Sequence, residues 1–404
     1  MNTPYYYIKE KDLLFDIELL ENSLKKYWGN YIMGYSVKTN SLPWLLKYLQ
    51  KKGFFAEVVS DTEYDLALKL GYNDDTVIYN GPIKDKQVFF KILENEGYVN
   101  LDSNYELDWL EERYACNSKE TCIGGALQKE YAVGLRVNCD ISSLCPDEVL
   151  VEEDGGRFGY CYENGSLSLA IDRLKALPNV KIAGIHLHSS TQSRSVKVYA
   201  ALAKMAVKLA KEYDLSLEYV DMGGGYFGGR ADKPDYSHYI PAICEELAKH
   251  FKPDATKLIV EPGVSLISRA STFVTSVIDT KDVRGIRYVV TDGSRVNLNP
   301  QVTRHIYPHH FELLENIDRK YMETQWICGS TCMEYDRLFK IEKEEELVSG
   351  DKIIYDTAGG YTICLTPLFI HYFPAVYVEH MDGSLFTARK PWTNTEYMQN
   401  NFTE

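Results

Sequence analysis

Short apolar runs alternate with amphipathic stretches between residues 31 and 261. Eight runs have the length and the aromatic or β-branched content of buried strands: 31–38, 54–60, 76–80, 98–102, 131–138, 180–188, 217–222 and 257–261. Helical patterns occur between them, for example at 42–52, 61–70, 84–96 and 198–213. Eight strand–helix units in about 230 residues predict a (β/α)₈ TIM barrel. A doubly wound sheet, which usually has fewer strands at this length, is the competing interpretation.

The pattern changes after Pro262. Runs such as STFVTSVIDT, IRYVVTD, DKIIYDT and PAVYVEH are β-like and follow one another with few long helices between them. They predict a second, mostly antiparallel β domain. We expect three segments: an N-terminal strand segment at 1–25 that joins the β domain, a barrel at 26–265, and a C-terminal β domain at 266–404.

Composition narrows the class of protein. The formal net charge of −14 disfavours a nucleic-acid partner. No run approaches the roughly 20 apolar residues of a membrane span, and the N-terminus lacks the pattern of a signal peptide. The nine cysteines contain no C-x-x-C pair. We therefore expect a cytoplasmic enzyme with reduced thiols.

Chemical groups in a barrel are expected where its strands end. Lys38 closes the run GYSVK and is either a solvated strand end or, if partly desolvated, an amine able to form a Schiff base. Gly223, Gly224 and Gly225 follow LEYVDM and form either an ordinary turn or a set of N–H donors for phosphate. Glu261 closes KLIVE and needs a partner, which is either a salt bridge or a protonated pyridine nitrogen.

His186 and His188 alternate with apolar residues, so both side chains are expected on one side of their strand. The pair suggests either metal ligands or a hydrogen-bonded histidine in the interior. A metal-dependent barrel hydrolase using both, with His305, His309 or His310, is one alternative function.

The order of the motifs resembles the fold-type III pyridoxal-phosphate decarboxylases, the group of ornithine, arginine and diaminopimelate decarboxylases. The matching motifs, spread between Pro4 and Glu379, are YSVKTN, RVNCD, GGRFG, GIHLHSSTQ, VDMGGGYFGG, VEPG, GSTCMEYD and AGGYT. The chain looks most like a diaminopimelate-decarboxylase-type protein with altered substrate motifs. This resemblance implies an alanine racemase-like plan, pyridoxal 5'-phosphate as cofactor, no metal, and release of carbon dioxide from an amino acid.

The resemblance also implies roles for individual residues. Lys38 would carry the cofactor as a Schiff base, His188 would stack on its ring, and Glu261 would pair with its ring nitrogen. Arg136 would lie close to the ring. The residues expected to bind phosphate are Gly223, Gly224, Gly225, Gly263, Tyr361 and Thr191, the last standing where the family usually has serine.

Two further residues would come from the β domain of a second subunit, because the family shares its sites across a head-to-tail homodimer. Asp336 would contact substrate. Cys332 would lie near the α-carbon, where a cysteine can return a proton as a general acid.

Two positions depart from the family pattern. Val264 stands where the family usually has arginine, and Met333 stands where an acidic residue usually holds the distal amine of the substrate. A buried charge left without its partner costs about 2–5 kcal/mol, so we expect a non-standard amino-acid substrate rather than ornithine, lysine or meso-diaminopimelate. An arginine elsewhere could restore a contact with a carboxylate; the candidates are Arg269, Arg295 and Arg304.

Two more alternatives share the cofactor. One is an amino-acid racemase of the same barrel plan. The other is a non-catalytic cofactor-binding protein, which the presence of Lys38, Glu261 and Cys332 together disfavours.

Overall fold

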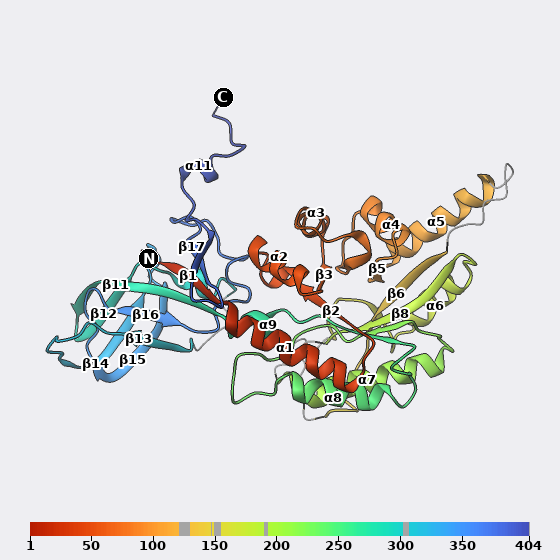
Figure 1. Cartoon of the computed structure of the whole chain (residues 1–404), viewed down its shortest axis with the longest axis horizontal. Coiled ribbons are helices and arrows are strands. Elements are labelled where there is room, and N and C mark those ends of the chain that lie inside the picture. The colour runs from red at the N-terminus through yellow and green to blue at the C-terminus, as the bar shows by residue number, and fades with distance from the viewer. Residues whose placement is uncertain (121–129, 147, 149–154, 190–192, 302–306, 404) are drawn as a thin grey trace. The chain divides into compact units, whose positions relative to one another are not determined.

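A computed structural model describes the chain except for residues 121–129, 147, 149–154, 190–192, 302–306 and 404 (Figure 1). The chain divides into two compact units. Unit 1 consists of Met1–Asp16, Thr39–Leu42 and Val264–Glu404, and unit 2 of Ile17–Lys38 and Pro43–Gly263.

Unit 2 is a closed barrel of parallel strands. In chain order these are β2 (Tyr31–Ser36), β3 (Phe55–Val58), β4 (Val77–Tyr79), β5 (Tyr98–Leu101), β6 (Tyr131–Asn138), β8 (Val180–Leu187), β9 (Tyr219–Asp221) and β10 (Lys257–Val260). β2 pairs with both β3 and β10, and β5 pairs with β6, which closes the ring. The short β7 (Tyr160–Cys161) adds to β6. The predicted eight-stranded barrel is confirmed, because a doubly wound sheet would keep two open edges.

Helices precede or connect the barrel strands, and polar side chains cap the first turns of some of them. Ser60 accepts a hydrogen bond from the N–H of Glu63, and Asp85 accepts from Gln87 and Val88, so donors at the starts of α3 and α4 are satisfied. The helices are α1 (Glu10–Tyr27), α2 (Pro43–Lys51), α3 (Asp61–Lys69), α4 (Lys86–Glu94), α5 (Asn104–Glu120), α6 (Ser166–Lys175), α7 (Val196–Glu212) and α8 (Tyr236–Leu247).

In the described part of the chain, the search for a helix with the length and hydropathy of a membrane span finds none.

The barrel interior is packed around one aromatic ring. Tyr219 lies in a cluster with Ile32, Ile78 and Ile259. A Cβ atom on Gly184 would stand 2.2 Å from the ring of Tyr219, which explains why a residue without a side chain occupies β8 there. The Tyr219 hydroxyl donates a hydrogen bond to Asn100 Oδ1 at 2.9 Å and so anchors the polar residues described below.

Unit 1 is a mostly antiparallel sheet with the path β15-β14-β12-β11-β1-β17-β18. The strands are β1 (Tyr5–Lys9), β11 (Ser271–Val283), β12 (Ile286–Thr291), β13 (His309–Glu312), β14 (Tyr321–Cys328), β15 (Arg337–Glu345), β16 (Lys352–Tyr355), β17 (Ala375–Glu379) and β18 (Leu385–Arg389). Its short helices are α9 (Val264–Ile267), α10 (Arg295–Leu298) and α11 (Asn394–Tyr397). A barrel and a separate, mostly antiparallel sheet confirm the predicted fold class.

The N-terminal strand lies inside the sheet of unit 1. β1 pairs antiparallel with β11 and parallel with β17. Tyr6 and Ile8 are fully buried, and the Tyr6 hydroxyl donates to the carbonyl of Asn297 at 2.7 Å. The first residues of the chain therefore complete a sheet formed mainly by its last third.

Candidate active site

Lys38 lies two residues beyond strand β2, in the 3₁₀ turn η1 (Val37–Thr39). Its Nζ forms an ion pair with the carboxylate of Glu57, a residue of β3 that is 1% exposed. Ser36 donates a second hydrogen bond to Glu57 Oε2 at 2.7 Å. Burial alone would raise the pKa of Glu57, but the Lys38 cation and these hydrogen bonds hold that pKa below its usual value. Glu57 is therefore an anion that fixes the lysine head group.

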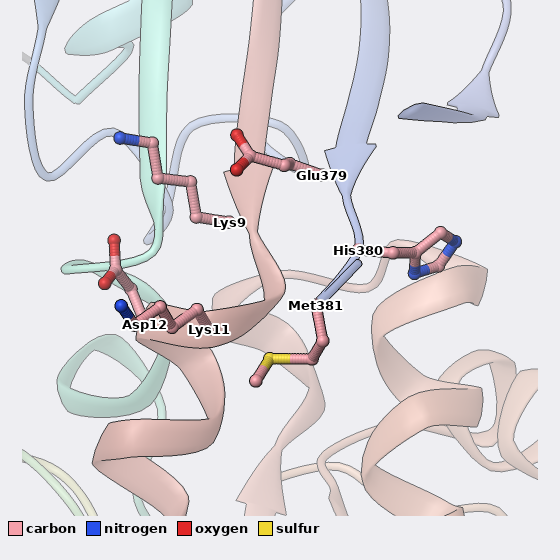
Figure 2. Close-up of a pocket in the computed structure, with 6 residues that line it drawn as sticks. All are labelled: Lys9, Lys11, Asp12, Glu379, His380 and Met381. Carbon is pink, nitrogen blue, oxygen red and sulfur yellow. The ribbon is translucent and has the colours of Figure 1, made fainter. Parts of the chain in front are cut away.

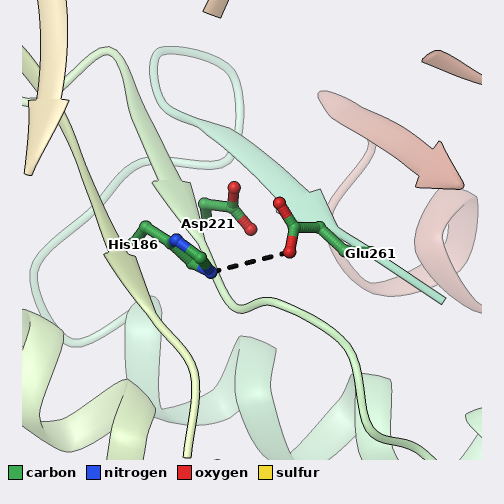
Figure 3. Close-up of side chains that lie close together, drawn as sticks. All are labelled: His186, Asp221 and Glu261. Atoms are coloured by element: carbon green, nitrogen blue, oxygen red, sulfur yellow. Dashed lines mark ion pairs between the residues drawn. The ribbon is translucent and has the colours of Figure 1, made fainter. Parts of the chain in front are cut away.

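Glu261 follows strand β10, and Asp221 ends the neighbouring strand β9. Both side chains are buried, and they lie close together (Figure 3). Burial is the main cause that raises the pKa of each carboxyl group, and the negative charges of Asp221 and Glu57 raise that of Glu261 further. Two adjacent buried carboxyl groups cannot both ionise cheaply, so Asp221 and Glu261 together hold a proton.

His186 points from β8 toward the same two carboxyl groups (Figure 3). Its Nε2 is 3.5 Å from Glu261 Oε2, and neither ring nitrogen makes a hydrogen bond within the described residues. Burial, with the Arg136 charge, lowers the pKa of His186 well below its usual value, so the ring is neutral.

Possible metal ligands do gather here, but they are not the predicted pair. Among the described residues, His186, Asp221 and Glu261 bring one ligand atom each to within 4.8 Å of one another. His188 is not part of this group. It follows the end of β8, and its ring centroid lies 6.4 Å from that of His186.

His188 lies instead against the glycine loop. A Cβ atom on Gly223 would stand 2.8 Å from His188, and one on Gly225 would stand 3.4 Å from its Cε1. A Cβ atom on Gly224 would stand 2.2 Å from the carbonyl oxygen of Glu261. Only glycines allow the loop to lie this close to both residues, and φ is positive at Gly223 (+61°) and Gly225 (+89°).

The same glycine loop also presents backbone N–H groups. Tyr199 donates to the carbonyl of Gly224 at 3.0 Å, which orients that peptide. Within the described residues, the N–H groups of Gly224 and Gly225 make no hydrogen bond. Successive N–H groups in a turn with positive φ form an anion-binding concavity.

Arg136 and Gly263 are two further predicted site residues in unit 2. Arg136 on β6 lies 3.4 Å from Asp102 and over the ring of Phe158. Burial, followed by the charges of Arg136 and Lys38, lowers the pKa of His188 to about 3, so its ring is also neutral. Gly263 is the last residue of unit 2. Thr191 lies outside the described residues.

Tyr361 and Val264 lie in unit 1. Tyr361 has a positive φ of +56°, and its N–H donates to the carbonyl of Thr39 at 2.9 Å. A Cβ atom on Gly360 would stand 2.8 Å from a methyl group of Val264. The valine that replaces the family's arginine therefore packs against the AGGYT turn.

The loop that carries Cys332 and Met333 is held by Asp336. The Asp336 side chain is buried and accepts from Ser294 Oγ (2.9 Å), the N–H of Arg295 (2.9 Å) and Thr331 Oγ1 (2.7 Å). Both carboxylate oxygens are thus engaged within unit 1. This arrangement favours a positioning role for Asp336 over the substrate contact expected from the sequence. The neighbouring Cys332 is exposed, and Met333 is half-buried.

The possible replacement arginines differ in their surroundings. Arg269 is paired with the buried Asp16 at 3.2 Å from both carboxylate oxygens. Arg295 donates to the carbonyl of Tyr335 at 3.1 Å and thus lies beside the loop of Met333. Arg304 lies outside the described residues.

The other histidines proposed as metal ligands belong to unit 1 or are not described. His309 contacts the carbonyl of Tyr307 at 2.5 Å, and His310 lies 3.2 Å from Asp356. His305 lies outside the described residues.

The groups in unit 2 fit pyridoxal phosphate. They supply an amine at Lys38, a carboxyl group at Glu261, a neutral flat ring at His188, and a concavity of N–H groups that any Cβ atom would fill. Pyridoxal phosphate carries the complement of each group: an aldehyde for the amine, a basic ring nitrogen for the carboxyl group, an aromatic face for the flat ring, and a phosphate for the N–H groups.

Comparison with known proteins decides between the alternatives. Residues 15–268, more than half of the chain, match the family described as pyridoxal-dependent decarboxylase, pyridoxal binding domain. The chain belongs to this family. It is therefore a pyridoxal 5'-phosphate-dependent amino-acid decarboxylase, and neither the racemase nor the hydrolase alternative is supported.

Several relatives are similar over nearly the whole chain. A probable chloroplastic diaminopimelate decarboxylase of Oryza sativa subsp. japonica is 26% identical over 409 residues, which cover 98% of this chain and 79% of the relative. A diaminopimelate decarboxylase of Aquifex aeolicus is 26% identical over 85% of this chain and 79% of the relative. The crystal structure of diaminopimelate decarboxylase from M. jannaschi superposes with a TM-score of 0.82 at 21% identity, covering 100% of this chain and 93% of that one, which shows a shared fold.

Sequence reasoning missed four polar residues of this decarboxylase's barrel: Glu57, Asn80, Asn100 and Asp221. Each stands at or near the end of an apolar run, in FFAEVVS, TVIYN, YVNLD and LEYVDM. The sequence could therefore have revealed them, because the rule that selected Lys38 and Glu261, that functional groups lie where barrel strands end, applies to them as well.

A separate hollow lies in unit 1, between the start of α1 and the end of β17 (Figure 2). It measures about 270 Å³ and is lined by Lys9, Lys11, Asp12, Glu379, His380 and Met381. No residue predicted to act on the cofactor or the substrate lines it.

We predict that Asp336→Ala lowers the free energy of unfolding of the decarboxylase by about 1–3 kcal/mol, because the change leaves buried donors without an acceptor. Chemical denaturation measures the effect. Glu334→Ala, in the same loop, removes an exposed carboxylate that is paired with Arg337 at 3.5 Å, and it is the control, with an expected change within about 0.5 kcal/mol. Equal effects of the two variants would contradict the positioning role of Asp336.

Proposed function

We propose that this decarboxylase holds pyridoxal 5'-phosphate covalently through Lys38 and acts on an amino acid with a non-standard distal group. The observation that supports Lys38 is its place beside β2, where its amine is fixed by the buried Glu57 and lies in the same polar network as Glu261. A lysine that served only as a solvated strand end would need no buried carboxylate.

The bound cofactor supplies an electron sink, which accepts the electron pair left on the α-carbon when carbon dioxide departs. In this proposal Glu261 holds the proton on the ring nitrogen and so maintains that sink. His188, being neutral, covers the ring face without adding a charge, and the N–H groups of Gly224 and Gly225 bind the phosphate.

After carbon dioxide has left, the α-carbon must receive a proton, so the site needs a proton donor there. We propose that the thiol of Cys332 delivers this proton, because it lies exposed on a loop fixed by Asp336. We further propose that the loop acts in the site of a second copy of this chain, in a head-to-tail homodimer with shared active sites.

The substrate class follows from the two apolar replacements. Val264 packs against Gly360, and Met333 offers no charge to a distal ammonium group. Because a buried charge without a partner costs about 2–5 kcal/mol, we propose a substrate whose distal end is neither a free ammonium nor a carboxylate bound in the usual way. Of the candidate replacement arginines, Arg295 contacts the Met333 loop, through Tyr335 and Asp336.

We expect Lys38→Ala to lose covalently bound cofactor and to lower kcat on the order of a thousandfold or more, as removal of a covalent catalytic group does. Borohydride reduction of the wild-type enzyme followed by peptide mapping should place the label on Lys38. Lys38→Arg, which keeps a cation for Glu57, should fold normally and be equally inactive. A label on another lysine would refute the assignment.

We expect Met333→Asp to shift the ratio of kcat/KM toward amino acids with a distal amine by about 10- to 100-fold, since a hydrogen bond to a charged group contributes about 1.5–3 kcal/mol. Carbon dioxide release from a panel of amino acids measures this ratio. Met333→Leu keeps an apolar side chain and should leave the ratio unchanged. If the aspartate variant keeps the wild-type preference, Met333 does not select the substrate.

We expect a mixture of inactive Lys38→Ala and Cys332→Ala subunits to recover about a quarter of full activity. At equal, random exchange half of the dimers are mixed, and each mixed dimer has one intact site of two. A mixture of Lys38→Ala with Glu261→Ala should recover nothing, because both changes lie in the barrel and each site then carries one of them. Mixed dimers of the first pair that remain inactive would exclude shared sites.

A further inference from the structure

A chain of hydrogen bonds crosses the barrel interior and links the two ends of the cofactor site. It runs from Lys38 to Glu57, from Glu57 to Asn80, and from Asn80 to Glu261. Asn80 directly follows β4 and is 3% exposed. Its Nδ2 donates to Glu57 Oε1 at 3.1 Å and to Glu261 Oε1 at 2.7 Å. No other described side chain donates hydrogen bonds to both carboxyl groups.

We propose that Asn80 is a positioning residue for the decarboxylation, whose amide holds the carboxylate beside Lys38 and the carboxyl group for the cofactor's ring nitrogen in one fixed arrangement. This inference rests on the proposed roles of Lys38 and Glu261. Asn80 itself contacts neither the lysine nor, in this proposal, the substrate.

An amide is the side chain that this place requires. One amide nitrogen carries two N–H donors, which matches two carboxyl acceptors, while the amide is neutral and adds no charge. An aspartate at position 80 would donate nothing when ionised and would add a fourth acidic group to Glu57, Asp221 and Glu261. An alanine would leave both carboxyl groups without this donor in a buried site, where unsatisfied polar groups are costly.

Neighbouring residues fix which way the amide points. Asn80 Oδ1 accepts a hydrogen bond from Asn100 Nδ2 at 2.9 Å. The same Asn100 nitrogen lies 3.2 Å from Asp221 Oδ2, and Asn100 Oδ1 accepts from the Tyr219 hydroxyl. Because the ionised Glu57 can only accept, it must face the Asn80 nitrogen, and the Asn80 oxygen must then face the Asn100 nitrogen, so the orientation of both amides is determined along the chain.

The hydrogen bond from Asn80 favours the ionised form of Glu261. The ionisable groups that face Glu261 are Asp221 on β9, Glu57 on β3, Lys38 after β2, His186 on β8, and the phenols of Tyr219 and Tyr226. Burial and the two carboxylates oppose ionisation of Glu261, whereas Lys38 favours it. Without the Asn80 donor the carboxylate is less stable, so a higher pH is needed to ionise it.

The test compares Asn80→Ala with the matched variant Asn100→Ala in the full-length enzyme loaded with pyridoxal 5'-phosphate. Each variant removes three hydrogen bonds from the same buried chain, but only the first removes direct donors to Glu57 and Glu261. Three quantities are measured: the dissociation constant of the cofactor, the pH dependence of its absorption band, and the pH profiles of kcat and KM.

For Asn80→Ala we expect the acidic limb of the kcat profile and the transition of the absorption band to move up by about one pH unit, which corresponds to the loss of one hydrogen bond to a charged group. The cofactor should bind about tenfold more weakly, and KM should change little. Asn80→Asp should show shifts at least as large. Asn100→Ala, which removes a donor to Asp221 but none to Glu57 or Glu261, should move both pH midpoints by less than half as much as Asn80→Ala.

The proposal fails if Asn80→Ala keeps the wild-type midpoints, or if Asn100→Ala shifts them equally, since the role would then be general support of the core. If Asn80→Ala does not fold, Asn80→Ser is measured in its place. The serine keeps one donor, so the pH midpoints should shift in the same direction but by less. A wild-type pH profile in Asn80→Ser overturns the proposal. Failure of the underlying function is distinguishable, because it appears in the wild-type enzyme as borohydride labelling at a lysine other than Lys38.

Discussion

Three carboxyl groups, Glu57, Asp221 and Glu261, are buried inside one barrel, where Lys38 is ion-paired with Glu57, and their mutual repulsion is the constraint on which the site depends. Lys38 can neutralise only one of them, and its ion pair selects Glu57. The other two accommodate their charge by sharing a proton and by accepting hydrogen bonds from Asn80, Asn100 and the backbone of Gly223. Burial therefore has two effects: it raises the pKa of Glu261, and it makes each remaining hydrogen bond to that group important.

The parallel barrel is what brings these groups together. Lys38, Glu57, Asn80, His186, Asp221 and Glu261 come from six strands or from the residue or two that follow them. Since all strands run in one direction, their carboxyl ends meet at one end of the barrel, and a polar residue that ends one strand faces those that end its neighbours. The interior below them is filled by Tyr219 and aliphatic side chains, so the polar chain has a rigid floor and little freedom to rearrange.

The residues proposed to act from unit 1 are positioned in a different way. Cys332 and Met333 lie on a loop between strands rather than at a strand end, and the buried carboxylate of Asp336 is consumed in holding that loop. A loop fixed in this way can change the residues at its tip without disturbing the sheet beneath it. The replacement of an acidic residue by Met333 is such a change, and it alters the proposed substrate class while the barrel that binds the cofactor is left intact.

The sequence by itself determined the strand–helix order, the eight barrel strands and the antiparallel character of the second unit, and its motifs led to the proposal that Lys38, His188, Glu261 and the glycine loop serve one cofactor. These features are local: periodicity, turn residues and short motifs encode them directly. Only the tertiary structure decided that Glu57 holds Lys38, that Asn80 joins Glu57 to Glu261, that Asp336 is committed to its own loop, and that β1 lies between β11 and β17. Those choices depend on which strands become neighbours when the barrel and the sheet close, and on which buried acid obtains the cation of Lys38. Neither can be read from spacing along the chain, because hydrogen bonds and ion pairs are set by distances across the fold rather than by separation in sequence.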